Sequence, residues 1–268
     1  MRIVCMIGTP PYLNYFINEI ARHHELALVI REDAHTNTNL RKKILKKGIL
    51  NTARIVVNRL RNRKRLQKDY NEILGSQWQQ PSGEFPLFNT PDINSKAVIQ
   101  QLQEIKPDLV LVHGTSLIKN KTLAGIPLAL NLHWGLSPYY KGSYCTEWAL
   151  INHDPYNIGF TIHRISSKID AGDILTQAAV SIAPEDTANR INMRLTRLGT
   201  QEMVAVITRL QHGETPVFTT QDNNHSALYL TKDWTQKKQR ESAALENPVS
   251  IKTMLDTPVR PALPVVTW

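Results

Sequence analysis

Asn131 and His133 stand at the end of the apolar run LALNLH, residues 128–133. A spacing of two places both side chains on one face of an extended strand. An amide donates hydrogen bonds through its NH2 group, and a charged imidazole donates through N–H. Together they could hold the negative charge that develops on a carbonyl oxygen, with roughly 3 kcal/mol from each well-placed donor. The pair therefore indicates acyl transfer through a tetrahedral intermediate.

Transfer to an amine also requires a group that takes a proton from the attacking nitrogen. The best-placed carboxylate is Asp170, in the Gly-containing turn KIDAGDIL at residues 168–175, and it would orient His133 and stabilise its charged form. Each residue alone has an ordinary explanation, since Asn131 and Asp170 could be turn residues and His133 a core histidine. Nothing in the spacing ties the other histidines of this region to a site: His113, His153 and His163.

The elements that would position these residues alternate between strand and helix. Apolar runs predict strands at residues 2–8, 26–30, 87–90, 108–114, 128–133, 158–165 and 173–182, and helical spacing predicts helices at 11–24, 96–104 and 187–210. This alternation is typical of a Rossmann-like α/β fold: an open, mostly parallel sheet with helices on both faces. Such sheets bind ligands beyond the carboxyl ends of their strands, where Asn131 and His133 stand.

Length and composition are those of one sizeable globular domain, with 268 residues, 41% hydrophobic and 21% charged. We expect a main domain at residues 1–212 and a short, Pro- and polar-rich C-terminal extension at 213–268. No apolar run is long enough to span a bilayer, and the first residues lack a signal-peptide cleavage pattern. Cys5 and Cys145 give neither a disulfide framework nor metal-ligand spacing. These features predict a cytoplasmic protein without a bound metal.

The positive charge is concentrated in one segment. Residues 41–68 contain twelve Lys or Arg and no acidic residue, and removing those charges from the formal net charge of +9 leaves −3. We favour a solvated, amphipathic helical insertion spanning about residues 36–75. The alternative is a surface that binds an anionic partner, such as nucleic acid, nucleotide phosphates or an acidic membrane.

The stretch that follows the strand at 128–133 is rich in aromatic side chains. It holds Trp134, Tyr139, Tyr140, Tyr144 and Trp148, although only 7% of the chain is aromatic. Aromatic faces in a polar loop would suit a sugar ring or a nucleobase. For Trp148 we favour the other interpretation, that it begins a buried helix.

Four blocks in this order resemble a known family: NLH at 131–133, LSPYYKG at 136–142, GFTIH at 159–163 and DAGDI at 170–174. The order and spacing are similar to those of the formyltransferases that use 10-formyltetrahydrofolate, which act on glycinamide ribonucleotide, methionyl-tRNA or nucleotide sugars. The resemblance covers about residues 84–212, and the turn at residues 8–10 is similar to that of the methionyl-tRNA members. Residues 35–80 and the C-terminal tail do not match, and the family's Leu-Leu-Pro is Leu-Ser-Pro here.

The resemblance implies roles for individual residues. Asn131 and His133 would hold the formyl oxygen, and Asp170 would support the charged His133 and assist proton movement. The pterin of 10-formyltetrahydrofolate would bind, mostly through backbone groups, between two loops. One loop is Gly114, Thr115, Ser116, Leu117 and Ile118, and the other is Ile169, Ala171, Gly172 and Asp173.

The expected function is transfer of a formyl group from 10-formyltetrahydrofolate to a primary amine of a small molecule. We favour an amino sugar carried on a nucleotide, because the loop is aromatic and only about 55 residues follow the last predicted helix. The alternatives are methionyl-tRNA formylation, with residues 41–68 contacting phosphates, hydrolysis of the formyl donor, or a scaffold without turnover. The sequence leaves the oligomeric state open.

Overall fold

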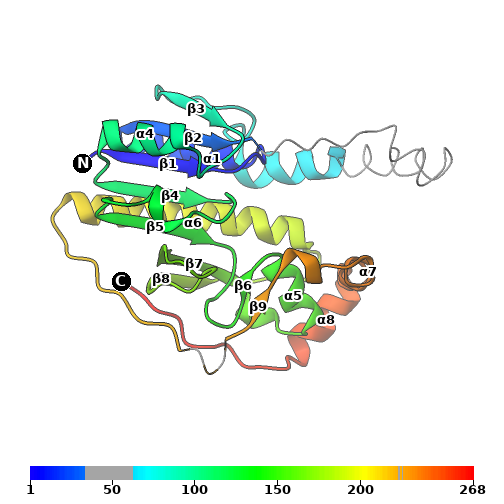
Figure 1. Cartoon of the computed structure of the whole chain (residues 1–268). Coiled ribbons are helices and arrows are strands. Elements are labelled where there is room, and N and C mark those ends of the chain that lie inside the picture. The colour runs from blue at the N-terminus through cyan, green and yellow to red at the C-terminus, as the bar shows by residue number, and fades with distance from the viewer. Residues whose placement is uncertain (34–62, 223, 225) are drawn as a thin grey trace.

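The computed structural model describes residues 1–33, 63–222, 224 and 226–268. Its main sheet is built from β1 (Ile3–Ile7), β2 (Leu26–Glu32), β3 (Leu87–Thr90), β4 (Leu109–His113), β5 (Leu128–His133), β7 (Gly159–Arg164) and β8 (Ile174–Ala179). The strand order is β3-β2-β1-β4-β5-β7-β8 (Figure 1). The first five are parallel neighbours, whereas β7 runs antiparallel to both β5 and β8. The predicted open, mostly parallel α/β sheet is confirmed.

Helices cover both faces because the strands alternate apolar side chains between the two sides. The odd-numbered side chains of β1 are buried on the face that α1 (Leu13–His23) and α6 (Ala188–Gln211) cover. Its even-numbered side chains, Val4 and Met6, lie on the face that α4 (Lys96–Ile105) covers. Ser95 and Thr187 cap α4 and α6 by accepting hydrogen bonds from backbone N–H groups, so both predicted helix starts are confirmed.

The C-terminal extension contains regular elements that the sequence did not predict. These are β9 (Leu228–Tyr229), α7 (Gln236–Leu245) and α8 (Pro248–Asp256), and in Figure 1 the extension (orange to red) runs beneath β7 and β8. β9 pairs in parallel with β6 (Lys141–Gly142), and Gln177 of β8 donates its backbone N–H to Val266 O at 2.7 Å. These elements are short or polar and depend on tertiary partners, so the sequence pattern alone did not reveal them.

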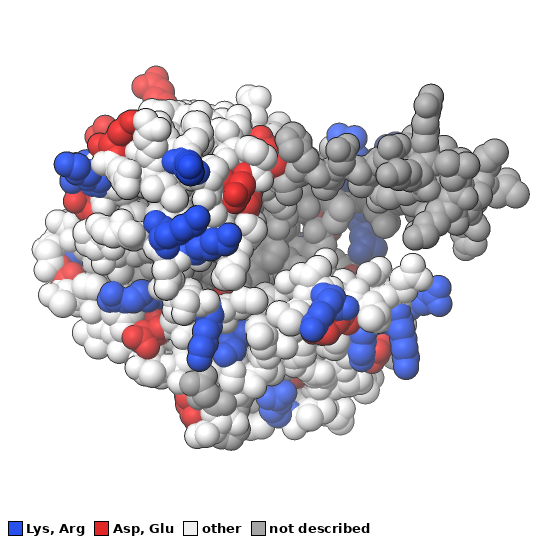
Figure 2. Space-filling view, in the orientation of Figure 1, with Lys and Arg blue, Asp and Glu red and all other residues white. Residues whose placement is uncertain are grey.

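Most of the predicted basic insertion, residues 36–75, lies outside the described residues, and so does most of the predicted anion-binding segment, 41–68. Residues 63–74 are helical. Arg190 of α6 fixes this helix by contacting Asp69 at 2.9 Å and Glu72 at 2.8 Å. On the face shown in Figure 2, the described Lys and Arg side chains are interspersed with Asp and Glu. None of the described helices is long and apolar enough to cross a membrane.

The loop between β5 and α5 (Cys145–Ile151) is held by buried polar groups. Thr161 Oγ1 donates to Gly135 O at 2.6 Å and accepts from Ser137 N at 3.0 Å. The Tyr140 hydroxyl donates to the fully buried Asp154 carboxylate at 2.7 Å. These bonds attach the loop to β7 and to the segment after α5.

We predict that Tyr140→Phe lowers the free energy of unfolding by about 2 kcal/mol, because it removes a hydrogen bond to a buried charged group. Urea unfolding measures the change. The matched control is Tyr156→Phe, whose lost hydroxyl is exposed and donates to Leu255 O at 2.9 Å. We expect a change below about 0.5 kcal/mol for that variant. Equal losses in the two variants would contradict the assignment.

Candidate active site

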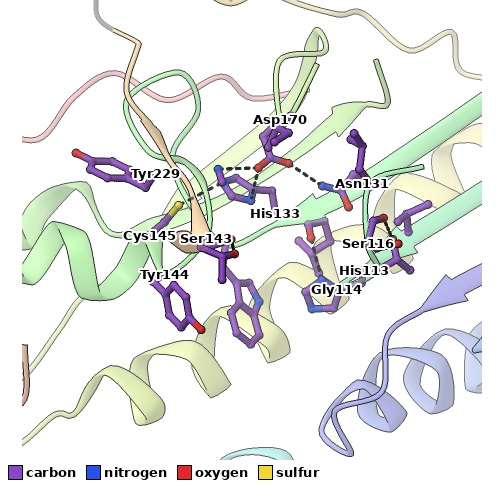
Figure 3. A pocket seen from close by; sticks show the side chains of 18 of the residues that line it. His113, Gly114, Ser116, Asn131, His133, Ser143, Tyr144, Cys145, Asp170 and Tyr229 are labelled. Atoms are coloured by element: carbon purple, nitrogen blue, oxygen red, sulfur yellow. Dashed lines mark hydrogen bonds and ion pairs between the residues drawn. The ribbon is translucent and has the colours of Figure 1, made fainter. Parts of the chain in front are cut away.

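The three residues singled out from the sequence meet at the carboxyl end of β5 (Figure 3). His133 Nδ1 lies 3.3 Å from Asp170 Oδ2, and Asn131 Nδ2 donates to Asp170 Oδ1 at 3.4 Å. Asp170 comes from the loop between β7 and β8, with a left-handed backbone at φ +45°. The structure therefore brings Asn131, His133 and Asp170 into one cluster, as predicted.

The Asp170 loop is fixed from two sides. The Gly142 N–H of β6 donates to Asp170 Oδ2 at 2.8 Å. The Gln221 side chain donates to Asp170 O at 2.8 Å and to Gly172 O at 2.7 Å. Gly172 approaches β7 so closely that a Cβ would lie 1.7 Å from Arg164 O. Gln221 belongs to the C-terminal extension, and no signal in the sequence links it to this loop.

The hydrogen bonds of His133 determine where its protons sit. Nε2 is 2.9 Å from Tyr140 O, and because a carbonyl oxygen only accepts, Nε2 carries a hydrogen and donates it. In the neutral ring Nδ1 is then the bare nitrogen, and it faces the Asp170 carboxylate. Cys145 Sγ also lies 3.7 Å from Nε2. Nδ1 is consequently the position at which His133 can take up a proton.

Burial and charge set the protonation states of this pair. Burial lowers the pKa of His133, and the neighbouring Asp170 offsets this only in part. Burial alone would raise the pKa of Asp170, but His133, His163 and the Gly142 N–H outweigh it and hold this pKa well below its usual range. At neutral pH the site therefore contains an ionised carboxylate beside a neutral imidazole with a free Nδ1.

His163 belongs to the cluster, although its spacing in the sequence gave no reason to include it. Its Nδ1 donates to Arg164 O at 2.9 Å, so Nε2 of the neutral ring accepts from Asn131 Nδ2 at 3.1 Å. The same Nε2 lies 3.4 Å from Asp170 Oδ1. The register explains the placement, because Asn131 of β5 is directly opposite His163 of β7. His163 and Asp170 together orient the Asn131 amide.

The cluster forms one wall of a cavity of about 720 Å³. Residues of the loop after β4, of α5 and of the C-terminal extension form other parts of its lining. Of the predicted donor-binding residues, Gly114, Thr115, Ser116, Leu117, Ile118 and Ile169 line this cavity, but Ala171, Gly172 and Asp173 do not. The donor-binding assignment stays a prediction for all nine.

The loop after β4 is held rigidly by two buried side chains. The Glu32 carboxylate of β2 accepts from Ser116 N at 2.7 Å and from its hydroxyl at 2.6 Å. Asn94 donates to Leu117 O at 3.0 Å and accepts from Lys119 N at 2.7 Å. The Ser116 side chain is thus engaged within the protein, and the loop is preorganised before any ligand binds.

Most of the aromatic side chains after β5 serve packing. Tyr140 and Trp148 are buried and stack on Tyr229 of the extension, with ring centroids 5.7 and 4.8 Å apart, so the buried position expected for Trp148 is confirmed. Tyr144 stacks on Trp234 at 4.8 Å and is 41% exposed. Only Trp134 and Tyr144 of the five aromatic residues line the cavity.

The fold and the site define an open α/β protein. Its polar cluster lies where such proteins bind ligands, at the carboxyl ends of parallel strands. Residues 3–207 match the family model described as formyl transferase. The chain therefore belongs to the formyl transferase family, and the resemblance seen in its four motif blocks is confirmed.

Curated relatives include methionyl-tRNA formyltransferases from five bacteria. The protein of Methylacidiphilum infernorum is 32% identical over 169 residues, 59% of this chain and 52% of that protein. The protein of Koribacter versatilis is 34% identical over 122 residues, 45% of this chain and 39% of that protein. The chain spans about half the length of the curated relatives it matches.

Solved structures show the same fold at low identity. A sugar N-formyltransferase from Shewanella is 15% identical with a TM-score of 0.56, over 90% of this chain and 87% of that chain. An N-formyltransferase from Helicobacter canadensis is 17% identical with a TM-score of 0.56, over 87% and 72%. Glycinamide ribonucleotide transformylase 1 from Symbiobacterium toebii is 20% identical with a TM-score of 0.55, over 83% and 94%.

A buried histidine beside the cluster predicts acid sensitivity. Burial lowers the pKa of His113 from 6.5 to about 4, although its hydrogen bond to Leu132 O opposes this. The pKa of His113 is lower in the folded state than in the unfolded state. Above pH 6.5 the residue is neutral in both states and costs nothing. As the pH falls toward 4, the unfolded state binds the proton first, so the free energy of unfolding decreases. The decrease amounts to roughly 3 kcal/mol in total and about 2 kcal/mol between pH 7 and pH 5.

The matched variant is His113→Asn, which keeps a donor for Leu132 O but does not titrate. We expect the unfolding free energy of the unmodified protein to fall by about 2 kcal/mol more than that of the variant between pH 7 and pH 5. Urea unfolding at both pH values checks this. Parallel losses in the two proteins would contradict the prediction.

Proposed function

We propose that the protein transfers a formyl group from 10-formyltetrahydrofolate to a primary amine, and that the acceptor is an amino sugar carried on a nucleotide. The observation that carries the proposal is the cluster of Asn131, His133 and Asp170 at the wall of a cavity of about 720 Å³. The family of the chain supports the reaction type. The size of the cavity is in the range that small-molecule and cofactor sites occupy.

The proposed proton movement follows from the hydrogen bonds of the site. The bare Nδ1 of His133 takes a proton from the attacking nitrogen, and the Asp170 carboxylate stabilises the imidazolium that results. The Asn131 amide exchanges its long, 3.4 Å hydrogen bond to Asp170 for one to the formyl oxygen as that oxygen gains negative charge, and the newly protonated Nδ1 can donate to it as well. The same proton then passes to the nitrogen that leaves with the folate.

We assign the donor to the half of the cavity between the loop at 114–118 and the Asp170 loop. The formyl donor would supply an activated carbonyl carbon there. The hydrogen bonds that Glu32 accepts and those that Asn94 makes hold the first loop in place, so its unused backbone groups can recognise the flat pterin without being ordered on binding. This fit supports folate as the donor.

The acceptor is assigned to the side lined by α5 and the extension. The Helicobacter canadensis N-formyltransferase was solved with folinic acid and dTDP-3-aminofucose, which supports an acceptor of that chemistry here. The partly exposed Tyr144 ring, fixed by Trp234, offers an aromatic face to a sugar or a base. A second candidate is methionyl-tRNA, which the names of the curated relatives favour.

An acceptor panel tests this proposal. The full chain is incubated with 10-formyltetrahydrofolate and either dTDP-3-aminofucose, other nucleotide-linked amino sugars, methionyl-tRNA, or no acceptor. We expect formylated amino sugar by mass spectrometry and little donor consumption without an acceptor. Formylation of methionyl-tRNA alone would support the second candidate. Equal donor consumption without any acceptor would identify a hydrolase instead.

We predict that Asp170→Asn lowers turnover at least ~100-fold, the scale for loss of one positioned acid–base partner. Asn keeps the shape and can still accept from Gly142 N, so the fold should persist. Loss of the negative charge lowers the pKa of His133 further, because Asp170 is the main group that raises it. The limb of the pH–rate profile on which the bare His133 forms should therefore move to lower pH. Parental turnover with an unmoved profile would remove Asp170 from the mechanism.

A further inference from the structure

Glu147, in the first turn of α5, is a titratable side chain of the cavity that the proton movement described above does not use. Its Oε1 accepts from Asn192 Nδ2 of α6 at 3.4 Å. Asn192 Oδ1 accepts from the Thr146 hydroxyl at 2.6 Å, so the amide is oriented with its nitrogen toward the carboxylate. Two residues before Glu147, Cys145 Sγ lies 3.7 Å from His133 Nε2. Because Glu147 lines the cavity from α5, it lies on the side that is assigned to the acceptor.

The surroundings of Glu147 favour a group that exchanges a proton near neutral pH. Burial raises the pKa of Glu147 to about 7, the nearby Glu246 adds to the rise, and the Asn192 hydrogen bond opposes it. Glu246 follows α7 and lies 3.8 Å from Arg65. The other titratable groups that interact with Glu147 are Tyr12, ahead of α1, and Cys145. Neither carries positive charge, so the described titratable groups that interact with Glu147 do not neutralise its carboxylate.

The proton balance of the proposed reaction leaves one proton that a second base could accept. A primary amine arrives mostly as an ammonium ion near neutral pH, and its conversion to a formamide removes two protons from the nitrogen. The departing nitrogen of the donor takes back only one of them. His133 Nδ1 accounts for that proton, because it receives one and returns one. The remaining proton has to leave the ammonium ion before attack and reach the solvent by another route.

We propose that Glu147 is the carboxylate that binds the ammonium group of the acceptor and takes its first proton; this rests on the proposed formyl transfer. The carboxylate and R–NH3⁺ become the carboxylic acid and R–NH2. The free amine attacks the formyl carbon, a new C–N bond forms, and the bond from the formyl carbon to the donor nitrogen breaks. The second proton passes through His133 to that leaving nitrogen, and Glu147 releases the first to solvent.

Binding of two sugars that differ in one group tests the proposal without measuring turnover. Glucosamine carries an ammonium group where glucose has a hydroxyl, and both are titrated into the full chain at pH 7.5 by calorimetry or ligand-observed NMR. We expect the unmodified protein to bind glucosamine roughly tenfold more tightly, the scale of one charge-assisted hydrogen bond. Glu147→Gln should bind both sugars equally. Equal binding by the unmodified protein, or a preference that survives in Glu147→Gln, would overturn the proposal.

Glu246→Gln is the matched control, since this carboxylate neighbours Glu147 but does not line the cavity. The preference for glucosamine should persist in it, and its loss would overturn the assignment to Glu147. Carbon-13 NMR of Glu-labelled protein adds a direct measurement, with the Glu147 signal identified by its absence from Glu147→Gln. Glucosamine should lower the pH at which this signal titrates, whereas glucose should not. Failure of formyl transfer in the acceptor panel would leave these binding results unchanged, so the two proposals can fail separately.

Discussion

The negative charge of Asp170, whose side chain is only 14% exposed, is the constraint on which the site and much of its surroundings depend. An ionised carboxylate inside a protein costs several kcal/mol unless hydrogen bonds and partner charges compensate it. Here separate segments place polar groups around it: the Asn131 amide of β5 and the Gly142 N–H of β6 donate to it. The rings of His133 on β5 and His163 on β7 lie 3.3 and 3.4 Å from its oxygens. Each segment must therefore be placed accurately before the charge can be tolerated. The same arrangement places the bare Nδ1 of the neutral His133 ring beside the carboxylate.

Much of the fold and part of this cluster could be predicted from the sequence, because the relevant signals are local. Apolar runs that alternate with helical segments predicted the sheet, and the spacing of two put Asn131 and His133 on one face. The position of His163 depends on the antiparallel register between β5 and β7, which residue spacing alone does not reveal. Gln221 lies in a polar stretch without periodicity, and only tertiary folding brings it to Asp170. Pairings over long sequence distances were the part that could not be predicted.

The aromatic stretch at residues 134–148 is a case in which the sequence carries a clear signal but not its meaning. Its composition was unusual enough to suggest a ligand surface, but Tyr140 and Trp148 are buried against Tyr229 of the extension. A large aromatic side chain stabilises a core or binds a ligand through the same apolar area, so residue type does not separate the two uses. The residue type of Glu32 did not reveal its role either: its buried carboxylate holds a loop 84 residues further along the chain. The aromatic composition marked the segment as unusual, and only the contacts in the structure show that most of its side chains serve packing.

Gly142 contacts both the Asp170 loop and β9 of the C-terminal extension. Its N–H holds Asp170, while a Cβ at this position would lie 2.1 Å from Tyr229 O of β9. The backbone of the extension therefore packs directly against the residue whose N–H donates to Asp170. Domain exchange between relatives would be limited by this contact, because a foreign C-terminal segment would have to reproduce the path of β9 as well as Gln221. Although the extension lies outside the matched family region, residues 3–207, its backbone path restricts which residues can stand at position 142.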